Sequence, residues 1–499
     1  MRLRSTIDAL CPTESPISHG TIVEVLVLNR LLSPRPLVHV GRWVADTGLD
    51  VLLEVDPALL NDDRIGRTLD ALAEVIADAQ STVCTHVVRA FDVQVHDVLS
   101  DTTATYLEGD YGDSKLAARG HSKDHRPGHK QIKLALATSM DGQIPLSHLT
   151  LPGNTGDVVT VPATLAALRA LWPTTPVVIS GDGVMWSEEN RDGVARAQGV
   201  FLGPIAMNPS VVRWVCAAEP DIEVLVQLTS QHKPVRYLAK VVDRFPVNGV
   251  ADAGAHLVVF DPRRAAEERE ERAQALIRYE AALADLVPRL NQGRLRKRID
   301  LDKRVGGLAK RHGLAARYVD VVVGGEVGFF TVRWARKDAE LVATLRRDGR
   351  WPLVTNRAGL TDEALCRWAV QRYKLHGRIE RDMHLLKGPL RLRPIFVQSD
   401  ERIRALMCLC VWALTAWTLL ERQGRKALPP QKKNVVPIRV RLESLVSMLA
   451  IVTYRLGDGS PLQRVVTKLP PRVASELREL GWIRELRELL DVAGRQPPS

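Results

Sequence analysis

Cysteine is scarce in this chain and is never clustered. The six cysteines among 499 residues are scattered, and none of them forms a C-x-x-C pair. The spacing typical of structural zinc sites is therefore absent, and unpaired thiols fit a reducing cytosol. The N-terminal stretch, MRLRSTIDALCPTESP, has no apolar signal core. No internal repeat is evident either, and we expect a cytoplasmic protein.

Long apolar runs are also scarce, with one exception. Residues 405–420, ALMCLCVWALTAWTLL, are about as long as a short membrane span. Charged residues flank this run (Arg402, Arg404 and Glu421), and the chain contains no second run of its kind. This favours a helix buried in a large core over a membrane anchor, so we expect no membrane partner.

The chain is long and carries a net positive charge. With 499 residues it is too long for one ordinary domain. Lys and Arg outnumber Asp and Glu by 69 to 58, which gives a net charge of +11. One explanation is a polyanionic partner, of which nucleic acid is the commonest. A mildly basic enzyme without such a partner is the alternative that charge leaves open.

Residue periodicity predicts an α/β protein that begins with helices. Apolar residues recur at intervals of three and four in residues 19–90, which indicates helices. A Val- and Thr-rich strand is expected after residue 91, followed by a hairpin whose turn is Asp141-Gly142. A helix and a short buried strand, PVVISGDG, come next. This order predicts the opening of an RNase H-like catalytic core.

The pattern changes from residue 203 to about residue 350. Strand-like segments there surround one long polar helix, and the strand WPLVTN and a helix over residues 361–388 then resume the main pattern. This predicts a strand-rich and helical subdomain inserted into the core. The expected domains are a helical N-terminal region that binds DNA ends (1–90), the RNase H-like core in two parts (91–202 and 351–425), the insertion subdomain (203–350) and a basic C-terminal region (426–499).

Three acids are candidates for phosphodiester chemistry. Two hard cations about 3.5–4 Å apart can neutralise a phosphate and activate a nucleophile, and such ions prefer carboxylate oxygens. Asp101 lies in a strand, Asp182 lies between two glycines at the end of a strand, and Glu380 lies on a helix among basic residues. The glycines leave backbone room for a bulky substrate. Each acid alone is weak evidence, because an Asp at a strand end is usually a surface or turn residue.

Several motifs together make the chain resemble a DDE transposase of a bacterial insertion sequence, in the IS-four-like superfamily. The last acid of that group lies in a Tyr–Arg–Glu–Lys signature. Tyr373, Glu380 and Lys387 match its spacing, and His376 stands where Arg is expected. Other segments are similar to the sixteen-thirty-four-type branch: SDTT around Asp101, RGHSKDHRPGHKQ, IPLSHLTLPGNTGD, GDGVMWSEEN and RPIFVQSDERI.

This resemblance implies a reaction and its site. It implies an RNase H-like core, cleavage at terminal inverted repeats and strand transfer into target DNA. It also implies that Asp101, Asp182 and Glu380 bind two Mg²⁺ ions, for which Mn²⁺ can substitute. Tyr373 and Lys387 become contacts to the terminal DNA. The implied partners are double-stranded DNA and a second copy of the chain in a synaptic complex, at the nucleoid in the bacterial cytoplasm.

His376 and one basic loop complete the expected DNA contacts. We expect His376 to take the phosphate contact of the missing Arg, with Lys374 or Arg378 as alternatives. The loop contains His121, His125 and His129, whose spacing on a helix could hold a transition metal. Pro127 interrupts such a helix. A DNA-facing loop with His125 and Arg126 as contacts is therefore favoured, and an ordinary solvated loop is its alternative.

Two other functions fit parts of the pattern. A structure-specific DNA nuclease on an RNase H-like fold would need no strand transfer, and the spacing of Tyr373, Glu380 and Lys387 argues against it. A catalytically inactive DNA-binding derivative would not need all three acids, and all three are present.

Overall fold

The computed structural model describes most of the chain as two compact units. The described residues are 1–427 except 48, 121–125, 127, 228–233 and 394, and then 451–454, 463–466, 475 and 478–479. One unit is Met1–Leu202 with Tyr373–Ser499, and the other is Gly203–Arg372. The second unit begins where the insertion was expected. It contains β11 (Arg350–Thr355), which pairs with β8 (Val250–Phe260).

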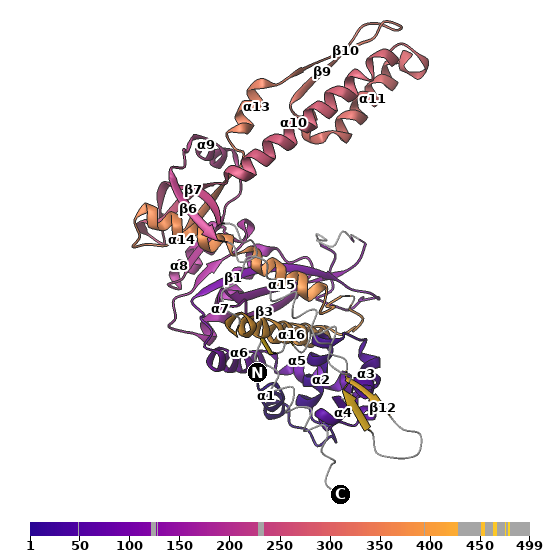
Figure 1. The fold of residues 1–499 in the computed structure, drawn as a ribbon, viewed down its shortest axis with the longest axis vertical. Helices are drawn as coiled ribbons and strands as arrows, with labels where there is room; N and C mark the ends of the chain where they lie inside the picture. The colour runs from indigo at the N-terminus through magenta and orange to yellow at the C-terminus, as the bar shows by residue number, and fades with distance from the viewer. Residues whose placement is uncertain are drawn as a thin grey trace. The chain divides into compact units, whose positions relative to one another are not determined.

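Helices make up the beginning of the first unit, as the apolar periodicity predicted. Polar side chains fix where two of them begin: Ser18 accepts a hydrogen bond from the Thr21 N–H, and Asn61 accepts one from the Arg64 N–H. The helices are α1 (Leu3–Leu10), α2 (His19–Leu32), α3 (Val40–Thr47), α4 (Leu49–Leu52), α5 (Asp62–Glu74) and α6 (Ile76–Phe91) (Figure 1).

A mixed sheet follows, with the strand order β3-β2-β1-β4-β5 in this unit. The first three strands pair antiparallel, whereas β1, β4 and β5 pair parallel. The expected turn joins β2 to β3, with Gly142 at φ 88°, a conformation that glycine adopts without strain. The elements are β1 (Asp97–Tyr106), β2 (Gln131–Ser139), β3 (Pro145–Pro152), α7 (Thr160–Leu171), β4 (Val178–Ser180), α8 (Glu188–Arg196) and β5 (Val200–Pro204).

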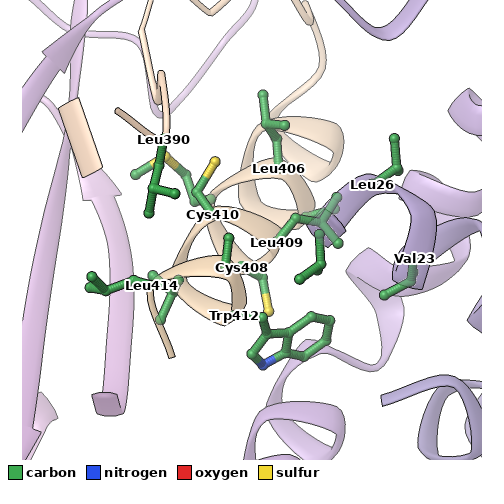
Figure 2. Packing of buried hydrophobic residues seen from close by; sticks show 14 of the residues in the cluster. Val23, Leu26, Leu390, Leu406, Cys408, Leu409, Cys410, Trp412 and Leu414 are labelled. Carbon is green, nitrogen blue, oxygen red and sulfur yellow. The ribbon is translucent and has the colours of Figure 1, made fainter. Parts of the chain in front are cut away.

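The long apolar helix α16 (Asp400–Ala427) is the centre of the core of this unit. It contacts α2 and α5 as well as β3, so it joins the N-terminal helices to the sheet. Figure 2 shows Leu409 and Trp412 of α16 packed near Val23 and Leu26 of α2. Among the described residues, α16 is the one helix long and apolar enough to cross a membrane, and 83% of its most apolar window is buried inside the protein. The expectation of a buried core helix is confirmed.

The second unit combines an antiparallel sheet with a segment made mostly of helices. Its strands β11, β8, β7 and β6 pair antiparallel in that order, and β9 and β10 form a separate pair. The elements are α9 (Pro209–Ala217), β6 (Ile222–Gln227), β7 (Pro234–Val247), α10 (Pro262–Ala284), α11 (Arg298–Arg311), α12 (Gly313–Ala316), β9 (Val319–Gly324), β10 (Thr331–Arg336), α13 (Asp338–Leu345) and α14 (Asp362–Lys374). The long polar helix expected in this segment corresponds to α10, which ends at Ala284, and five further α-helices belong to the described part of the unit.

The single helix expected over residues 361–388 is wrong. The chain forms α14 and then α15 (Gly377–Lys387), separated by a turn at Leu375 and His376. Within the turn, the His376 N–H donates to the Tyr373 carbonyl and the Ile379 N–H to the His376 carbonyl. These bonds span three residues instead of four, which gives the tighter backbone of a 3-10 turn. In the C-terminal part of the chain, β12 (Ile451–Tyr454) pairs with β13 (Gln463–Val466).

Candidate active site

Asp101 lies in the middle of β1, beside the point where the neighbouring parallel strand β4 ends before Asp182. Leu99 of β1 pairs with Ser180 of β4, and each acid follows its paired residue by two positions. Neighbouring strands lie about 4.8 Å apart, so the register places the two acids side by side at the carboxyl end of β4. This arrangement follows from the pairing alone.

The backbone directly before Asp182 packs closely against its neighbours in the protein. Gly181 is buried, and a Cβ there would lie 2.7 Å from the Met185 sulfur and 3.6 Å from the Ser100 carbonyl. The chain then leaves the sheet in a short 3-10 turn, which Asp182 caps by accepting a hydrogen bond from the Gly183 N–H at 2.6 Å. Asp182 remains exposed. Its carboxylate is therefore accessible to an ion or a substrate.

Asp101 is half-buried, and its surroundings are polar. Its Oδ1 accepts a hydrogen bond from the Thr102 N–H at 2.7 Å. The Thr102 hydroxyl donates to Asp157 at 2.7 Å, and the Lys133 ammonium contacts the same Asp157 oxygen at 2.7 Å. These contacts fix the backbone of β1 where Asp101 lies.

Glu380 reaches the same region because α15 packs on β1 (Figure 1). His376, at the start of α15, is only 8% exposed, and its Nε2 lies 3.2 Å from the Ser100 carbonyl, one residue before Asp101. Glu380 follows His376 by four residues and therefore lies on the same helix face. The carboxylate of Glu380 is exposed, and its Oε2 lies 4.0 Å from where a Cβ on Gly377 would be. The acid thus bends back toward the helix start, beside the strand that carries Asp101.

A second contact anchors α15 from the hairpin side. The buried Gln143, directly after the hairpin turn, donates through Nε2 to Asp382 Oδ1 at 3.2 Å and to the Arg378 carbonyl at 3.4 Å. Asp382 is fully buried. Burial, together with the charges of Arg425 and Arg381, lowers the pKa of Arg378 to about 10. Arg378 therefore stays charged at neutral pH.

Arg422 of α16 holds the hairpin turn itself. It is buried and donates to both oxygens of Asp141, at 3.1 and 2.7 Å, and to the carbonyls of Phe91 and Asp92. Burial alone would raise the pKa of the Asp141 carboxyl. Hydrogen bonds from Arg422 and from the Gln94 N–H outweigh that effect and hold the pKa below its ordinary value.

The expected phosphate contact through His376 is contradicted by this geometry. The ring is buried and faces the Ser100 carbonyl, and it lies 6.3 Å from the Tyr373 ring in a stacked arrangement. Because a turn precedes α15, Tyr373 and Glu380 lie in two different helices, α14 and α15. Lys387, the last residue of α15, is half-buried.

The expected basic loop is described only in part. Arg126 is exposed, and its guanidinium lies 4.8 Å from the centre of the Tyr106 ring. His125 and His121 lie outside the described residues, so the His-triad alternative is not described either. The sequence does not reveal Tyr106, Gln143 or the contact of His376 with the Ser100 carbonyl. No local motif marks them, because each acts through a partner far away in the sequence.

The donor set at this end of the sheet fits a hard divalent ion. All three side chains offer carboxylate oxygens, which Mg²⁺ and Mn²⁺ prefer. In the described part of the chain, no group of three or more His, Cys, Asp and Glu side chains is close enough to hold an ion. Mg²⁺ is often bound by one or two carboxylates, with water and substrate phosphate as its other ligands.

Two family models match the chain, one at its N-terminal region and one over most of the remainder. Residues 1–81 match a domain of unknown function (DUF4277), and residues 84–416 match the Transposase DDE domain. No curated protein matches the chain.

Two solved structures show weak similarity. A piggyBac transposase synaptic complex with hairpin DNA covers 100% of this chain and 84% of its own, at 8% identity and a TM-score of 0.39. A Mos1 transposase paired-end complex with the left transposon end covers 38% of this chain and 59% of its own, at 13% identity and a TM-score of 0.16. Similarity at this level is too low to assign a fold. The family domain spans more than half of the sequence, and the chain therefore belongs to the DDE transposases, enzymes that cut and transfer DNA with divalent metal ions.

Proposed function

We propose that Asp101, Asp182 and Glu380 are the catalytic, metal-binding acids of this transposase. The parallel register of β1 and β4 carries the proposal, because it pairs the residues two positions before Asp101 and Asp182, which belong to different motifs. The contact between His376 and the Ser100 carbonyl supports the third acid, because it holds the helix of Glu380 against β1.

The proposed ions are two Mg²⁺ ions, for which Mn²⁺ can substitute. When bound, they would neutralise charge on the scissile phosphate and favour deprotonation of the attacking water or hydroxyl. The chain itself supplies carboxylates that remain accessible at Asp182 and Glu380, and the absence of a side chain at Gly181 keeps the backbone compact beside them. His376 and Gln143 position α15 from two sides.

The proposed reaction has two steps at the ends of an insertion element. Water attacks the phosphorus at the terminal inverted repeat, the P–O3′ bond breaks, and the strand is released with a free 3′ hydroxyl. That hydroxyl then attacks a phosphorus of the target DNA, which displaces a 3′ oxygen and joins the two strands. Tyr373, Lys387, His125 and Arg126 are proposed as contacts to double-stranded DNA.

Four finer assignments belong to the same proposal: the fold of the core, the family branch, the oligomeric state and the location. The strand order β3-β2-β1-β4-β5, with one antiparallel hairpin beside parallel strands, supports an RNase H-like core that the unit Gly203–Arg372 interrupts. The spacing of Tyr373, Glu380 and Lys387 supports the Tyr–Arg–Glu–Lys group and its sixteen-thirty-four-type branch. Two element ends in one synaptic complex require a homodimer, and chromosomal DNA as the substrate places the enzyme at the bacterial nucleoid.

The test is cleavage and joining of a labelled duplex that carries the terminal inverted repeat. Asp101→Asn, Asp182→Asn and Glu380→Gln should each reduce Mg²⁺-dependent cleavage by at least about 100-fold, because each removes a ligand charge. Binding of the same duplex in EDTA should persist. Glu188→Gln is the matched control, because Glu188 is an exposed acid in the first turn of α8.

The products separate this function from its alternatives. A structure-specific nuclease would release cut ends without joined products, and an inactive derivative would give neither. Cleavage near the wild-type rate by any one of the three variants removes that acid from the proposed site.

A further inference from the structure

The strand of Asp101 extends beyond β4 and ends in a cluster of aromatic and basic side chains. Tyr106, the last residue of β1, has the guanidinium of Arg126 at 4.8 Å and that of Arg393 at 5.9 Å from the centre of its ring. His129 meets the same ring edge-on, with 5.6 Å between the ring centres. Both guanidinium groups lie within the range of a cation–π interaction.

Backbone hydrogen bonds bring this cluster together from three segments of the chain. The Leu107 N–H donates to the Lys130 carbonyl, and the Glu108 N–H donates to the Ile395 carbonyl, each at 3.0 Å. Leu107 and Ile395 also form an isolated parallel β-bridge. The arginines therefore converge on Tyr106 because the main chain places them there, although one precedes β2 and the other precedes α16 in the sequence.

The chemistry of the cluster suits a phosphate group. Arg126 is exposed and Arg393 is half-buried, and guanidinium groups bind phosphate oxygens with two parallel hydrogen bonds. The ring of Tyr106 restricts both side chains, which reduces the entropy lost when they bind. Glu108 lies 3.7 Å from His129 Nε2, and the two guanidinium groups at Tyr106 give the cluster its positive charge.

We propose that Tyr106, Arg126 and Arg393 form a binding site for the DNA backbone at a fixed distance from the cut. This inference rests on the proposed catalytic role of Asp101. Tyr106 follows Asp101 by five residues of the same strand, which corresponds to about 17 Å at about 3.3 Å per residue. Duplex DNA advances about 3.4 Å per base pair. A duplex whose axis runs along β1 therefore places the bound phosphate about five base pairs from the scissile bond, on whichever strand faces the cluster.

The first experiment measures binding without catalysis. The full chain is titrated with a duplex of the terminal inverted repeat in EDTA at several salt concentrations. Arg393→Gln and Arg126→Gln should each weaken binding by about tenfold and reduce the slope of log affinity against log salt by about 0.9. Arg196→Gln, at an exposed position in the last turn of α8, should leave both quantities unchanged.

Tyr106 variants separate a binding role from a folding role. Tyr106→Phe keeps the ring and should bind like the wild type, whereas Tyr106→Leu should lose part of the salt slope. Thermal unfolding of each variant shows whether it is folded. Slopes and affinities equal to those of the wild type in both arginine variants overturn the proposal, whatever the catalytic residues prove to be.

The second experiment locates the phosphate. Single uncharged methylphosphonate linkages are placed along each strand of the duplex. One placed about five nucleotides from the cut should weaken binding by the wild type, as the strand distance requires, but have no further effect on Arg393→Gln. If the sensitive linkage lies elsewhere, the distance argument fails even though the cluster binds DNA. If the duplex binds but is never cut, the proposed function fails and the salt slope still tests the cluster.

Discussion

Replacement of His376 by Ala tests how the site is held together. The substitution removes the ring whose Nε2 lies 3.2 Å from the Ser100 carbonyl. A carbonyl only accepts hydrogen bonds, so Nε2 is the protonated ring nitrogen and donates. Ser100 is 1% exposed, and loss of this donor in a buried setting costs about 1–3 kcal/mol of stability.

The effect on catalysis should be larger than the effect on folding. His376 holds the first turn of α15 against β1, and Glu380 lies one turn further along the same face. A displacement of about 1 Å in a catalytic group can cost about 100-fold in rate. We therefore expect His376→Ala to lower the cleavage rate at saturating DNA by about 10- to 100-fold, while binding of the element end in EDTA remains at the wild-type level.

The assay compares four proteins by single-turnover cleavage and by metal-free binding. His376→Gln retains an N–H donor on a side chain of similar reach and should recover most of the cleavage rate. His376→Arg introduces a longer charged group into a buried position and should be impaired. His384→Ala, an exposed histidine on the same helix, is the control for a change on α15. If His376→Ala weakens end binding and leaves the saturated rate unchanged, His376 contacts DNA and the positioning argument is refuted.

Two further predictions concern the hairpin that supports α15. Arg422→Ala should lower the free energy of unfolding by about 3 kcal/mol, since it removes the guanidinium that donates to Asp141 and to two carbonyls. Because the pKa of Asp141 is held low, its stabilising contribution is complete above the ordinary carboxyl pKa of about 4 and is lost as pH falls through the lowered value. The melting temperatures of wild type and variant should therefore converge at acidic pH, and a constant difference would contradict the ion pair. Gly142→Ala should destabilise the fold by about 1–3 kcal/mol, as chemical denaturation can measure, because its Cβ would lie 2.5 Å from Arg422 Cδ at φ 88°. A neutral effect would show that the turn rearranges.

Local signals in the sequence predicted the hairpin strands, the position of Asp101 within a strand and the position of Asp182 after one. The hairpin signal at Asp141-Gly142 depends on neighbouring residues only, and β2 and β3 pair around it. The glycines around Asp182 indicated a sharp exit from a strand, and the structure has a 3-10 turn there. Such features are encoded within a few residues, so periodicity and turn chemistry are sufficient to find them.

The missed features depend on contacts between distant residues. His376 and Ser100 are 276 residues apart in the sequence, and no periodic pattern reports such a contact. In the second unit, Glu268 and Arg272 have the spacing of a helical ion pair. Arg272 instead binds Asp348, and Glu268 accepts hydrogen bonds from Arg264 and from the Gly349 N–H. A buried partner with two oxygens outcompetes an exposed neighbour on the helix.

The active site and the N-terminal helices depend on one core. α16 packs on α2 and α5, and from the same helix Arg422 fixes the hairpin turn beside Gln143. Gln143 donates a hydrogen bond to Asp382 of α15, and His376 at the start of α15 contacts the Ser100 carbonyl of β1. Residues 1–81 match a separate family domain, yet their side chains share a hydrophobic cluster with α15, α16 and the sheet. An N-terminal segment taken from another transposase would therefore preserve the catalytic geometry only if its apolar side chains fit the surface of α16.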